Sequence, residues 1–250
     1  TGTESDWVSM PAGASGNALN LSGGYASLPS GVLSGVNDFT LATWVKLSSI
    51  SNGARIFDFG TGSTNCMYLS AQNPGTTGKP VFTIINNSVT RQIVSNVLIS
   101  PNVWTHIALT LSGNVATMYI NGASAGSVTN MTLHPATLGK TTTNYLGQSQ
   151  NADSKLSGSL DDFQIWGRAF SATDVQTLAT PDSQLAWYKT NETLGGVLSD
   201  SSTQHNDASF ANPAYAPGVS GNAMSLSGGG AATLPVGILG GTHNFTIAAW

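Results

Sequence analysis

The sequence contains a single cysteine, Cys66, in 250 residues, so no disulfide can form within the chain. A small secreted scaffold held together by several disulfides is therefore excluded, whereas export from a bacterial cell stays compatible with this composition. Charged residues make up only 8% of the chain, against about 25% in an average soluble domain. Serine, threonine, asparagine and glycine fill the surface instead, which is typical of all-β proteins that face the outside of a cell.

Other absences narrow the range of partners. The 12 acidic and 8 basic residues are scattered singly, so the sequence has no basic stripe that could neutralise nucleic-acid phosphates. No apolar run approaches the roughly 20 residues that a helix needs to cross a bilayer. We therefore expect no nucleic-acid partner and no membrane span. Hydrophobic residues make up 40% of the chain, which is enough to form a core.

A long internal repeat is the most informative feature that is present. Residues 15–28 return as residues 220–234 with one added residue, and residues 37–44 return as residues 243–250. An offset of 205 to 206 residues is too long for a solenoid or a propeller blade and fits whole domains in tandem. We interpret residues 1–180 as one near-complete domain and residues 181–250 as the start of a second copy, separated by a linker near Pro181. The chain then reads as a segment of a longer protein.

Short segments that alternate apolar and polar residues, separated by turn residues, predict β-strands. The expected strands are Phe39–Val45, Arg55–Phe59, Met67–Ala71, Val81–Ile85, Gln92–Val97, Thr105–Leu111, Ala116–Ile120 and Ser157–Trp166, with a further strand starting at Leu185–Tyr188. Only Ser171–Leu178 predicts a helix, with Ser171 as its N-cap and Asp174 completing a capping box. Many strands with almost no helix predict an all-β fold, a two-sheet antiparallel jelly-roll sandwich.

Six runs of residues follow one another in the order of a known family. They are Arg55–Gly60, Trp104–Gly113, Met118–Gly122, Tyr145–Gln150, Gly158–Trp166 and Arg168–Ser171. Together they make residues 15–178 resemble the laminin-G-like, concanavalin A-like jelly-roll modules (LamG family) of bacterial secreted glycoside hydrolases. The resemblance implies the sandwich fold. It does not by itself imply a function, because this fold occurs in lectins, enzymes and adhesion modules alike.

The two copies differ at their starts. The family usually opens with a strand that carries an acidic residue and then an Asp-Ser-Ser-type turn. The second copy has both, in Leu185–Glu192 and Asp200–Ser202, whereas nothing equivalent precedes Trp7. Two explanations stay open: the first domain has lost its opening strand by cropping, or residues 185–218 supply that strand and the chain is a circular permutation of one domain.

The resemblance also implies a structural calcium ion. In the family, an acidic pair in a strand lies near the calcium, with further ligands from the opening strand and the Asp-Ser turn. The corresponding positions are Asp161, Asp162, Glu192, Asp200, Asn206 and Asp207. Their oxygens suit calcium, which takes about six to eight of them. The alternative is that Asp161 caps a turn and that Asp162 is solvated or bonded to the backbone.

Sugar binding would use aromatic platforms together with amide and carboxylate hydrogen bonds. The candidates on the middle strands and loops are Asp58, Asn65, Tyr68, Gln72 and Arg91. Tyr68 fits a core position equally well. Trp104 and Trp166 fit the core by their alternation, His106 fits a packed strand residue, and Cys66 fits a small buried residue.

Our leading interpretation is a noncatalytic carbohydrate-binding or accessory module of a secreted, bacterial, multidomain glycoside hydrolase or other glycan-active protein. Its expected partners are poly- or oligosaccharides and neighbouring domains of the same chain. The alternative is a cell-surface adhesion or spacer repeat that binds protein partners. Catalysis by this segment is less well supported, because related family-16-type glucanases use two glutamates and an aspartate along one strand, and the chain contains only Glu4 and Glu192.

Overall fold

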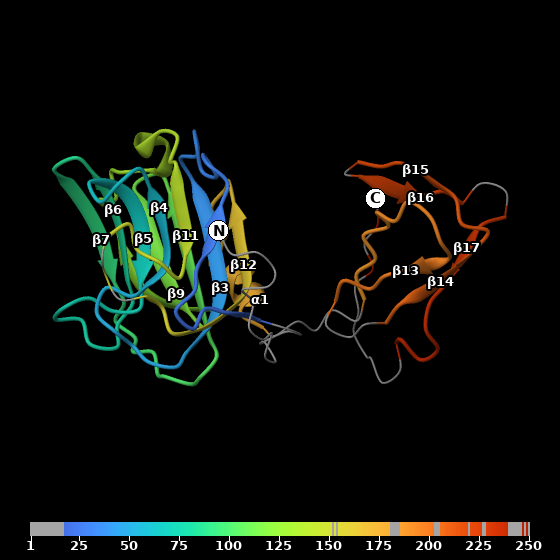
Figure 1. Cartoon of the computed structure of the whole chain (residues 1–250), viewed down its shortest axis with the longest axis horizontal. Helices are drawn as coiled ribbons and strands as arrows, with labels where there is room; N and C mark the ends of the chain where they lie inside the picture. The colour runs from blue at the N-terminus through green and yellow to red at the C-terminus, as the bar shows by residue number, and fades with distance from the viewer. Residues whose placement is uncertain are drawn as a thin grey trace. The chain divides into compact units, whose positions relative to one another are not determined.

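The computed structural model describes residues 18–151, 153, 155–180, 186–202, 206–219, 221–226, 229–239, 247 and 249. The chain divides into two compact units, Thr1–Pro181 and Asp182–Trp250, which we call unit 1 and unit 2 (Figure 1). Their interpretation as tandem copies stays a prediction. Each unit is described by itself below.

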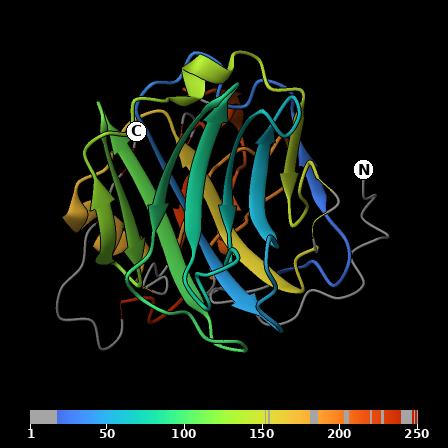
Figure 2. The same cartoon turned by 90° about the vertical axis from the view of Figure 1, so that its left-hand side faces the viewer.

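Unit 1 is a sandwich of two antiparallel sheets, each with six strands (Figures 1 and 2). The first sheet consists, in spatial order, of β1 (Leu19–Asn20), β12 (Gly158–Trp166), β3 (Phe39–Leu47), β8 (Thr105–Ser112), β9 (Val115–Ile120) and β10 (Ala123–Val128). The second sheet consists of β2 (Ala26–Leu28), β11 (Thr143–Leu146), β4 (Arg55–Gly60), β5 (Asn65–Ser70), β6 (Val81–Asn86) and β7 (Val89–Val94). This architecture confirms the predicted jelly-roll sandwich.

The core fills the space between the two sheets. Successive side chains of a strand point to opposite faces, so every second residue of a half-buried strand is apolar. Phe57 and Phe59 of β4 and Phe82 of β6 are at most 1% exposed and face Leu41 and Leu109 of the first sheet within one cluster. Their burial supplies the main driving force for closing the sandwich, at about 25 cal/mol per Å² of apolar surface.

A second, smaller cluster lies on the other face of the first sheet. Helix α1 (Ala172–Leu178) begins at the N-cap Ser171, and the predicted capping box with Asp174 is present. Val175 of this helix packs on Ala42 and Ala108, with Trp166 partly buried beside them. The prediction that Trp166 and Trp104 belong to the core was therefore wrong in part, since both are only half-buried. A short 3-10 helix, η2 (Pro135–Leu138), lies between β10 and β11 in the chain.

Most strands were predicted to within two residues of their ends, but two expectations failed. β7 begins at Val89 rather than at Gln92, because Asn86 and Val89 pair across a two-residue turn in which Asn87 has a φ of +53°. In unit 2, the strand expected from Leu185 reduces to an isolated bridge between Tyr188 and Asp200. Leu185 itself lies outside the described residues.

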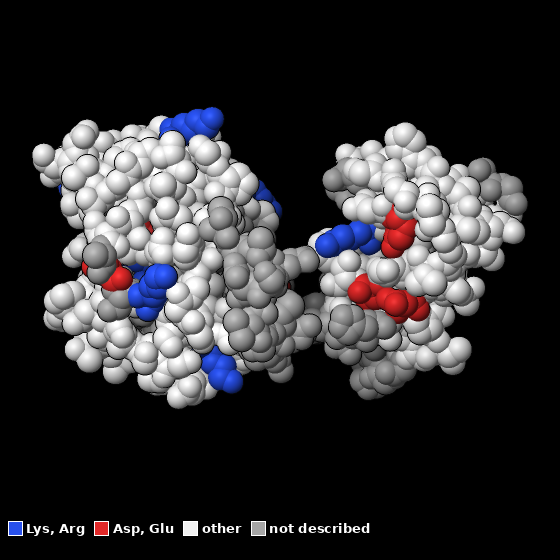
Figure 3. Space-filling view, in the orientation of Figure 1, with Lys and Arg blue, Asp and Glu red and all other residues white. Residues whose placement is uncertain are grey.

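Unit 2 is a smaller all-β body. β13 (Val197–Leu198), β14 (Ala208–Ala211) and β17 (Ala231–Thr233) form one sheet in that order, and β15 (Tyr215–Pro217) pairs with β16 (Asn222–Met224). Leu198, Ala208 and Phe210 make its small core. Charged side chains are sparse on the face of both units that Figure 3 shows. Within the described part of the chain, no helix is long and apolar enough to cross a membrane.

Candidate functional site

One row of side chains crosses the whole second sheet on the face that points away from the core. Residues directly opposite each other on paired strands share a face. The strand register places six residues in this row, one from each strand: Ser27, Tyr145, Asp58, Tyr68, Thr83 and Gln92. None of them belongs to the core cluster between the sheets. We call this surface the outer face of the second sheet.

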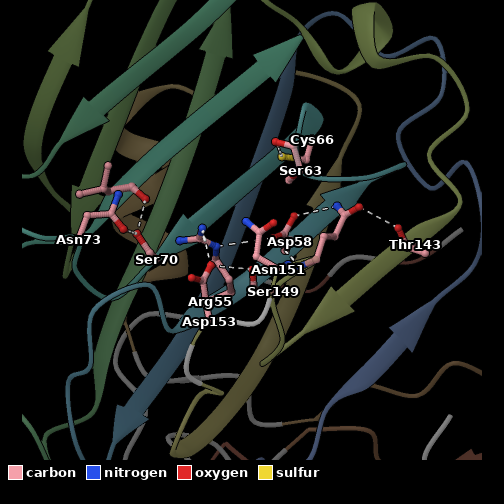
Figure 4. A network of polar contacts seen from close by, with 12 residues as sticks. Arg55, Asp58, Ser63, Cys66, Ser70, Asn73, Thr143, Ser149, Asn151 and Asp153 are labelled. Atoms are coloured by element: carbon pink, nitrogen blue, oxygen red, sulfur yellow. Dashed lines mark hydrogen bonds and ion pairs between the residues drawn. The ribbon is translucent and has the colours of Figure 1, made fainter. Parts of the chain in front are cut away.

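Arg55 is the centre of a polar cluster on the outer face (Figure 4). Its guanidinium carbon lies 3.6 Å from the centroid of the Tyr68 ring, within the range of a cation–π contact. Its Nε lies 3.6 Å from Oδ2 of Asp58, and its Nη2 donates a hydrogen bond of 3.1 Å to Oδ2 of Asp153. The guanidinium thus contacts three elements: β4 through Asp58, β5 through Tyr68, and the segment before β12 through Asp153.

Gln150, in the segment between β11 and β12, binds this segment to β4 by hydrogen bonds. Its backbone N–H and its side-chain Nε2 both donate to the carboxylate of Asp58, at 3.2 and 2.9 Å. Its Oε1 accepts a bond from Thr143 of β11, at 2.9 Å. The close approach requires Gly60, because a Cβ at that position would lie 2.3 Å from Gln150 Nε2. Ser149 adds a bond of 2.9 Å from its hydroxyl to Asp153 (Figure 4).

The environment shifts the pKa of two groups at this face. Burial raises the pKa of Asp58 above its ordinary value, and the hydrogen bonds from Gln150 and the charge of Arg55 offset only part of that rise. Burial also raises the pKa of the Cys66 thiol to about 12, with the charge of Asp58 adding to the rise. Cys66 is therefore a protonated, buried side chain, as its interpretation as a small core-like residue predicted.

Several buried polar atoms beside Tyr68 have no hydrogen-bond partner among the protein groups. They are Nε and Nη1 of Arg55 and the hydroxyl of Thr83. Arg55 is 5% exposed and Thr83 is 1% exposed. A buried group without a partner costs about 1–3 kcal/mol of stability. Such unpaired groups next to a half-buried tyrosine mark the outer face as the candidate site.

The structure brings together only two of the five residues predicted to bind a ligand. Asp58 and Tyr68 lie opposite each other on the outer face. Arg91 pairs with Ile84, a core residue, so it lies on the opposite face, where its Nε donates to Thr132. Asn65 donates to the carbonyl of Leu138 at 3.0 Å, and Gln72 contacts Asn52 at 2.9 Å.

Four residues of the cluster were not predicted as site residues: Arg55, Tyr145, Gln150 and Asp153. Tyr145 and Gln150 stand in a run that supported the family resemblance, but their contact with β4 depends on strand pairing over long sequence separations. The face on which Arg55 lies could not be predicted from the sequence because of a β-bulge. The register shifts between Arg55 and Phe57, so Arg55 pairs with Ser70 on the outer face, although strict alternation would place it on the core face with Phe57.

The predicted calcium ligands of unit 1 sit at another β-bulge. The register between β12 and β3 shifts between Asp161 and Gln164. Oδ1 of Asp161 accepts the backbone N–H of Asp162 at 2.9 Å, which is the local capping role that the sequence left open as the alternative. Asp162 is exposed and has a φ of +45°, in the left-handed region. Strand β12 is therefore irregular at this pair.

The other predicted calcium ligands lie in unit 2. The two carboxylate oxygens of Asp200 accept four hydrogen bonds, from the N–H groups of Trp187, Ser202 and Asn206 and from the Ser202 hydroxyl. Asp207 accepts the N–H of Asp200 at 2.8 Å, and Glu192 accepts the N–H of Ser199 at 2.9 Å.

The donor set around Asp200 does not fit a calcium ion as it stands. Its four hydrogen bonds use about all the lone-pair sites of one carboxylate, whereas calcium needs oxygens that are free to coordinate. Among the residues that the structure describes, no three His, Cys, Asp or Glu side chains gather closely enough to hold a metal ion. Calcium binding stays a prediction from the resemblance.

Two six-stranded antiparallel sheets with a polar outer face define a jelly-roll sandwich of the lectin and glucanase type. Residues 20–176 match the sequence pattern of the concanavalin A-like lectin/glucanases superfamily. The chain belongs to this superfamily. A comparison with curated proteins found no match.

Two solved structures illustrate the similarity. Domain 4 of AbnA, a GH43 extracellular arabinanase from Geobacillus stearothermophilus in complex with arabinotriose, is 25% identical with a TM-score of 0.61, over 68% of this chain and 79% of that chain. The CBM40 of the Ruminococcus gnavus IT-sialidase, bound to α2,3-sialyllactose, is 13% identical with a TM-score of 0.51, over 62% of this chain and 96% of that one. The second similarity concerns the fold alone.

Proposed function

We propose that unit 1 binds a neutral oligosaccharide on the outer face of the second sheet, around Tyr68 and Tyr145. The observation that carries this proposal is the cluster in which the Arg55 guanidinium lies against the Tyr68 ring and pairs with Asp58 and Asp153. Aromatic rings beside a few fixed polar groups are the usual composition of a small-ligand site.

The spacing of the two tyrosines supports an extended ligand. Tyr145 and Tyr68 lie in one row on the strands either side of β4, and neighbouring strands are about 4.8 Å apart, so the rings are separated by about 10 Å. Asp58 lies between them but is 1% exposed, so it anchors Gln150 rather than contacting a ligand. The ligand would therefore rest on the two half-buried tyrosine rings.

The similarity to the arabinanase domain supports the choice of ligand class. That domain was solved in complex with arabinotriose, a neutral oligosaccharide, and its 25% identity extends over 68% of this chain. The two carboxylates beside Arg55 outnumber its single charge, which disfavours an anionic sugar at this site. Arabinotriose is therefore the first probe.

We further propose that the module is noncatalytic and acts outside the cell as an accessory part of a glycan-active protein. Hydrolysis of a glycosidic bond requires two carboxylates that reach the bond. Asp58 is sealed from solvent and held by two donors from Gln150, so it cannot serve as one of that pair. The expected partners are an oligosaccharide and neighbouring domains of the same protein.

Isothermal titration calorimetry with arabinotriose and a panel of other neutral oligosaccharides tests this function. We expect Tyr68→Ala and Tyr145→Ala to weaken binding about fivefold each, since stacking on an aromatic ring contributes of the order of 1 kcal/mol. Arg91→Ala is the matched control, because Arg91 lies on the opposite face and should leave binding unchanged.

Two results would contradict the proposal. Equal loss of affinity in the Arg91→Ala and Tyr68→Ala variants would show that the outer face is not the binding surface. No heat of binding from any neutral oligosaccharide, with the variants and the native chain equally folded, would favour the alternative of an adhesion or spacer repeat. Release of reducing sugar by the native chain would contradict the noncatalytic assignment.

A further inference from the structure

A third tyrosine, Tyr25, lies beside Tyr145 at the edge of the outer face of the second sheet. It stands two residues before Ser27 of β2, and Ser27 pairs with Tyr145, so Tyr25 continues the outward-facing alternation of this strand. The ring centroids of Tyr25 and Tyr145 are 5.4 Å apart. The aromatic surface around the proposed saccharide site therefore continues beyond Tyr145.

The rings of Tyr25 and Tyr145 are nearly perpendicular, with an interplanar angle of 84°. This is the edge-to-face geometry that aromatic pairs prefer. A sugar ring that stacks flat on Tyr145 cannot stack flat on Tyr25 at the same time. Tyr25 therefore belongs to a separate position, next to the sugar residue that rests on Tyr145.

Lys155 places a positive charge at Tyr25. Its Nζ lies 5.6 Å from the centroid of the Tyr25 ring, within the range of a cation–π contact, and donates a hydrogen bond of 3.1 Å to the carbonyl of Gly23. The side chain is exposed, and an ammonium has three N–H donors, of which this bond uses one. These two contacts hold an accessible cation beside the ring.

The charge balance at Lys155 differs from that at Arg55. Arg55 has two carboxylates close to its guanidinium, Asp58 at 3.6 Å and Asp153 at 3.1 Å. None of the carboxylates that the structure describes lies within 4 Å of the Lys155 ammonium. A cation without a close counter-ion attracts an anion more strongly than one that is already paired. An anionic group is therefore disfavoured beside Arg55 and favoured beside Lys155.

We propose that Tyr25 and Lys155 form a subsite for an acidic sugar residue, a uronate, at the Tyr145 end of the saccharide site. The sugar ring packs against Tyr25, and its carboxylate accepts a hydrogen bond from the Lys155 ammonium. This inference rests on the proposed function, because the acidic residue adjoins the neutral sugar on Tyr145. It narrows the ligand class to glycans that carry an acidic residue next to neutral ones.

An NMR titration of the isotope-labelled 250-residue chain with sodium D-glucuronate and, separately, with D-glucose tests the subsite. The two probes differ only at C6, which is a carboxylate in one and a CH2OH group in the other. We expect saturable shift changes at Tyr25 and Lys155, with glucuronate binding about threefold more tightly, which is the advantage of one exposed ion pair. The preference should decrease at high salt, and Lys155→Met should abolish it.

Lys140→Met is the matched control. Lys140 is exposed like Lys155 but precedes β11, whereas Tyr25 lies beside the other end of that strand, where Leu146 pairs with Ala26. This variant should therefore keep the preference for glucuronate. A loss of the preference in both lysine variants would overturn the proposal, because net charge alone would then explain it.

The outcomes separate this inference from the proposed function. Equal affinity for glucuronate and glucose, in a chain that binds arabinotriose at Tyr68 and Tyr145, would overturn the acidic subsite alone. An unchanged preference in the Lys155→Met variant would overturn it as well. Glucuronate binding at Tyr25 in a chain that binds no neutral oligosaccharide would support the acidic subsite and contradict the proposed function.

Discussion

Arg55 lies over the ring of Tyr68, with its guanidinium carbon 3.6 Å from the ring centroid, and both side chains stand on neighbouring central strands of one sheet. The contact holds a tyrosine ring at the surface by means of a cation that is 5% exposed. A ring fixed in this way loses little conformational entropy when a ligand stacks on it, which is a requirement of a preorganised site.

Removing the charge of Arg55 should destabilise unit 1 strongly. Arg55→Met leaves the buried carboxylate of Asp58 without its ion pair, and breaking a buried pair costs about 3–5 kcal/mol. Urea unfolding measures the loss. The double variant Arg55→Met with Asp58→Asn should recover part of it, because no buried charge then remains unpaired. A loss below about 1 kcal/mol for the single variant would contradict the cluster as described.

The stability of unit 1 should fall in mild acid because of His106. This residue is 2% exposed, packs edge-to-face on Trp44, and burial lowers its pKa to about 4 from 6.5. Between these two pH values the unfolded chain binds a proton that the folded chain does not, so the unfolding free energy decreases as the pH falls.

The loss attributable to His106 is about 3 kcal/mol across that window. Unfolding in urea at about pH 7 and about pH 4.5 measures it, and His106→Gln removes this contribution from the pH dependence. An identical pH dependence in the native chain and in the His106→Gln variant would contradict the burial of a neutral ring. Other acidic groups titrate equally in both chains, so the difference between the chains isolates His106.

Asp162 tests the β-bulge in β12. Its φ of +45° is unfavourable for a side chain that branches at Cβ, whereas glycine adopts it readily. Asp162→Val should therefore cost about 1–2 kcal/mol of unfolding free energy, and Asp162→Gly should be tolerated within about 1 kcal/mol. A thermal unfolding series of the two variants measures the difference. Equal effects of Val and Gly would mean that the strand is regular at this position.

Calcium binding is tested at Asp200. The hydrogen bonds that fill its carboxylate predict that Asp200→Ala lowers the melting temperature of unit 2 equally in calcium and in EGTA. The resemblance predicts a different result: calcium raises the melting temperature of the native chain, by the free energy RT ln(1 + [L]/Kd), and Asp200→Ala abolishes the rise. The second outcome would establish the calcium site and would show that the Asp200 network rearranges to bind it.

The sequence predicted the sandwich well because its strands carry strong local signals. Phe39–Val45 and Thr105–Leu111 alternate in the period of a half-buried strand, and that pattern alone places their apolar residues between two sheets. The capping box of Ser171 and Asp174 was equally local, and the helix begins where it predicts.

The candidate site was harder to predict because it depends on irregular backbone and on pairing between distant segments. The bulge beside Arg55 moves one side chain to the other face, and alternation cannot reveal it. Gln150 and Asp153 reach β4 from more than ninety residues away in the chain. Arg91 was predicted as a ligand contact because it is polar. The register between β6 and β7 instead pairs it with Ile84, on the face toward the core.

The most direct test of the account is an NMR titration of the isotope-labelled 250-residue chain with arabinotriose. We predict that the shifts that change most belong to Tyr68, Tyr145, Thr83 and the side chain of Arg55, and that Arg91 and residues of β8 and β9 stay unchanged. Saturable changes that avoid Tyr68 and Tyr145 and gather on the first sheet would contradict the assignment of the outer face as the saccharide site.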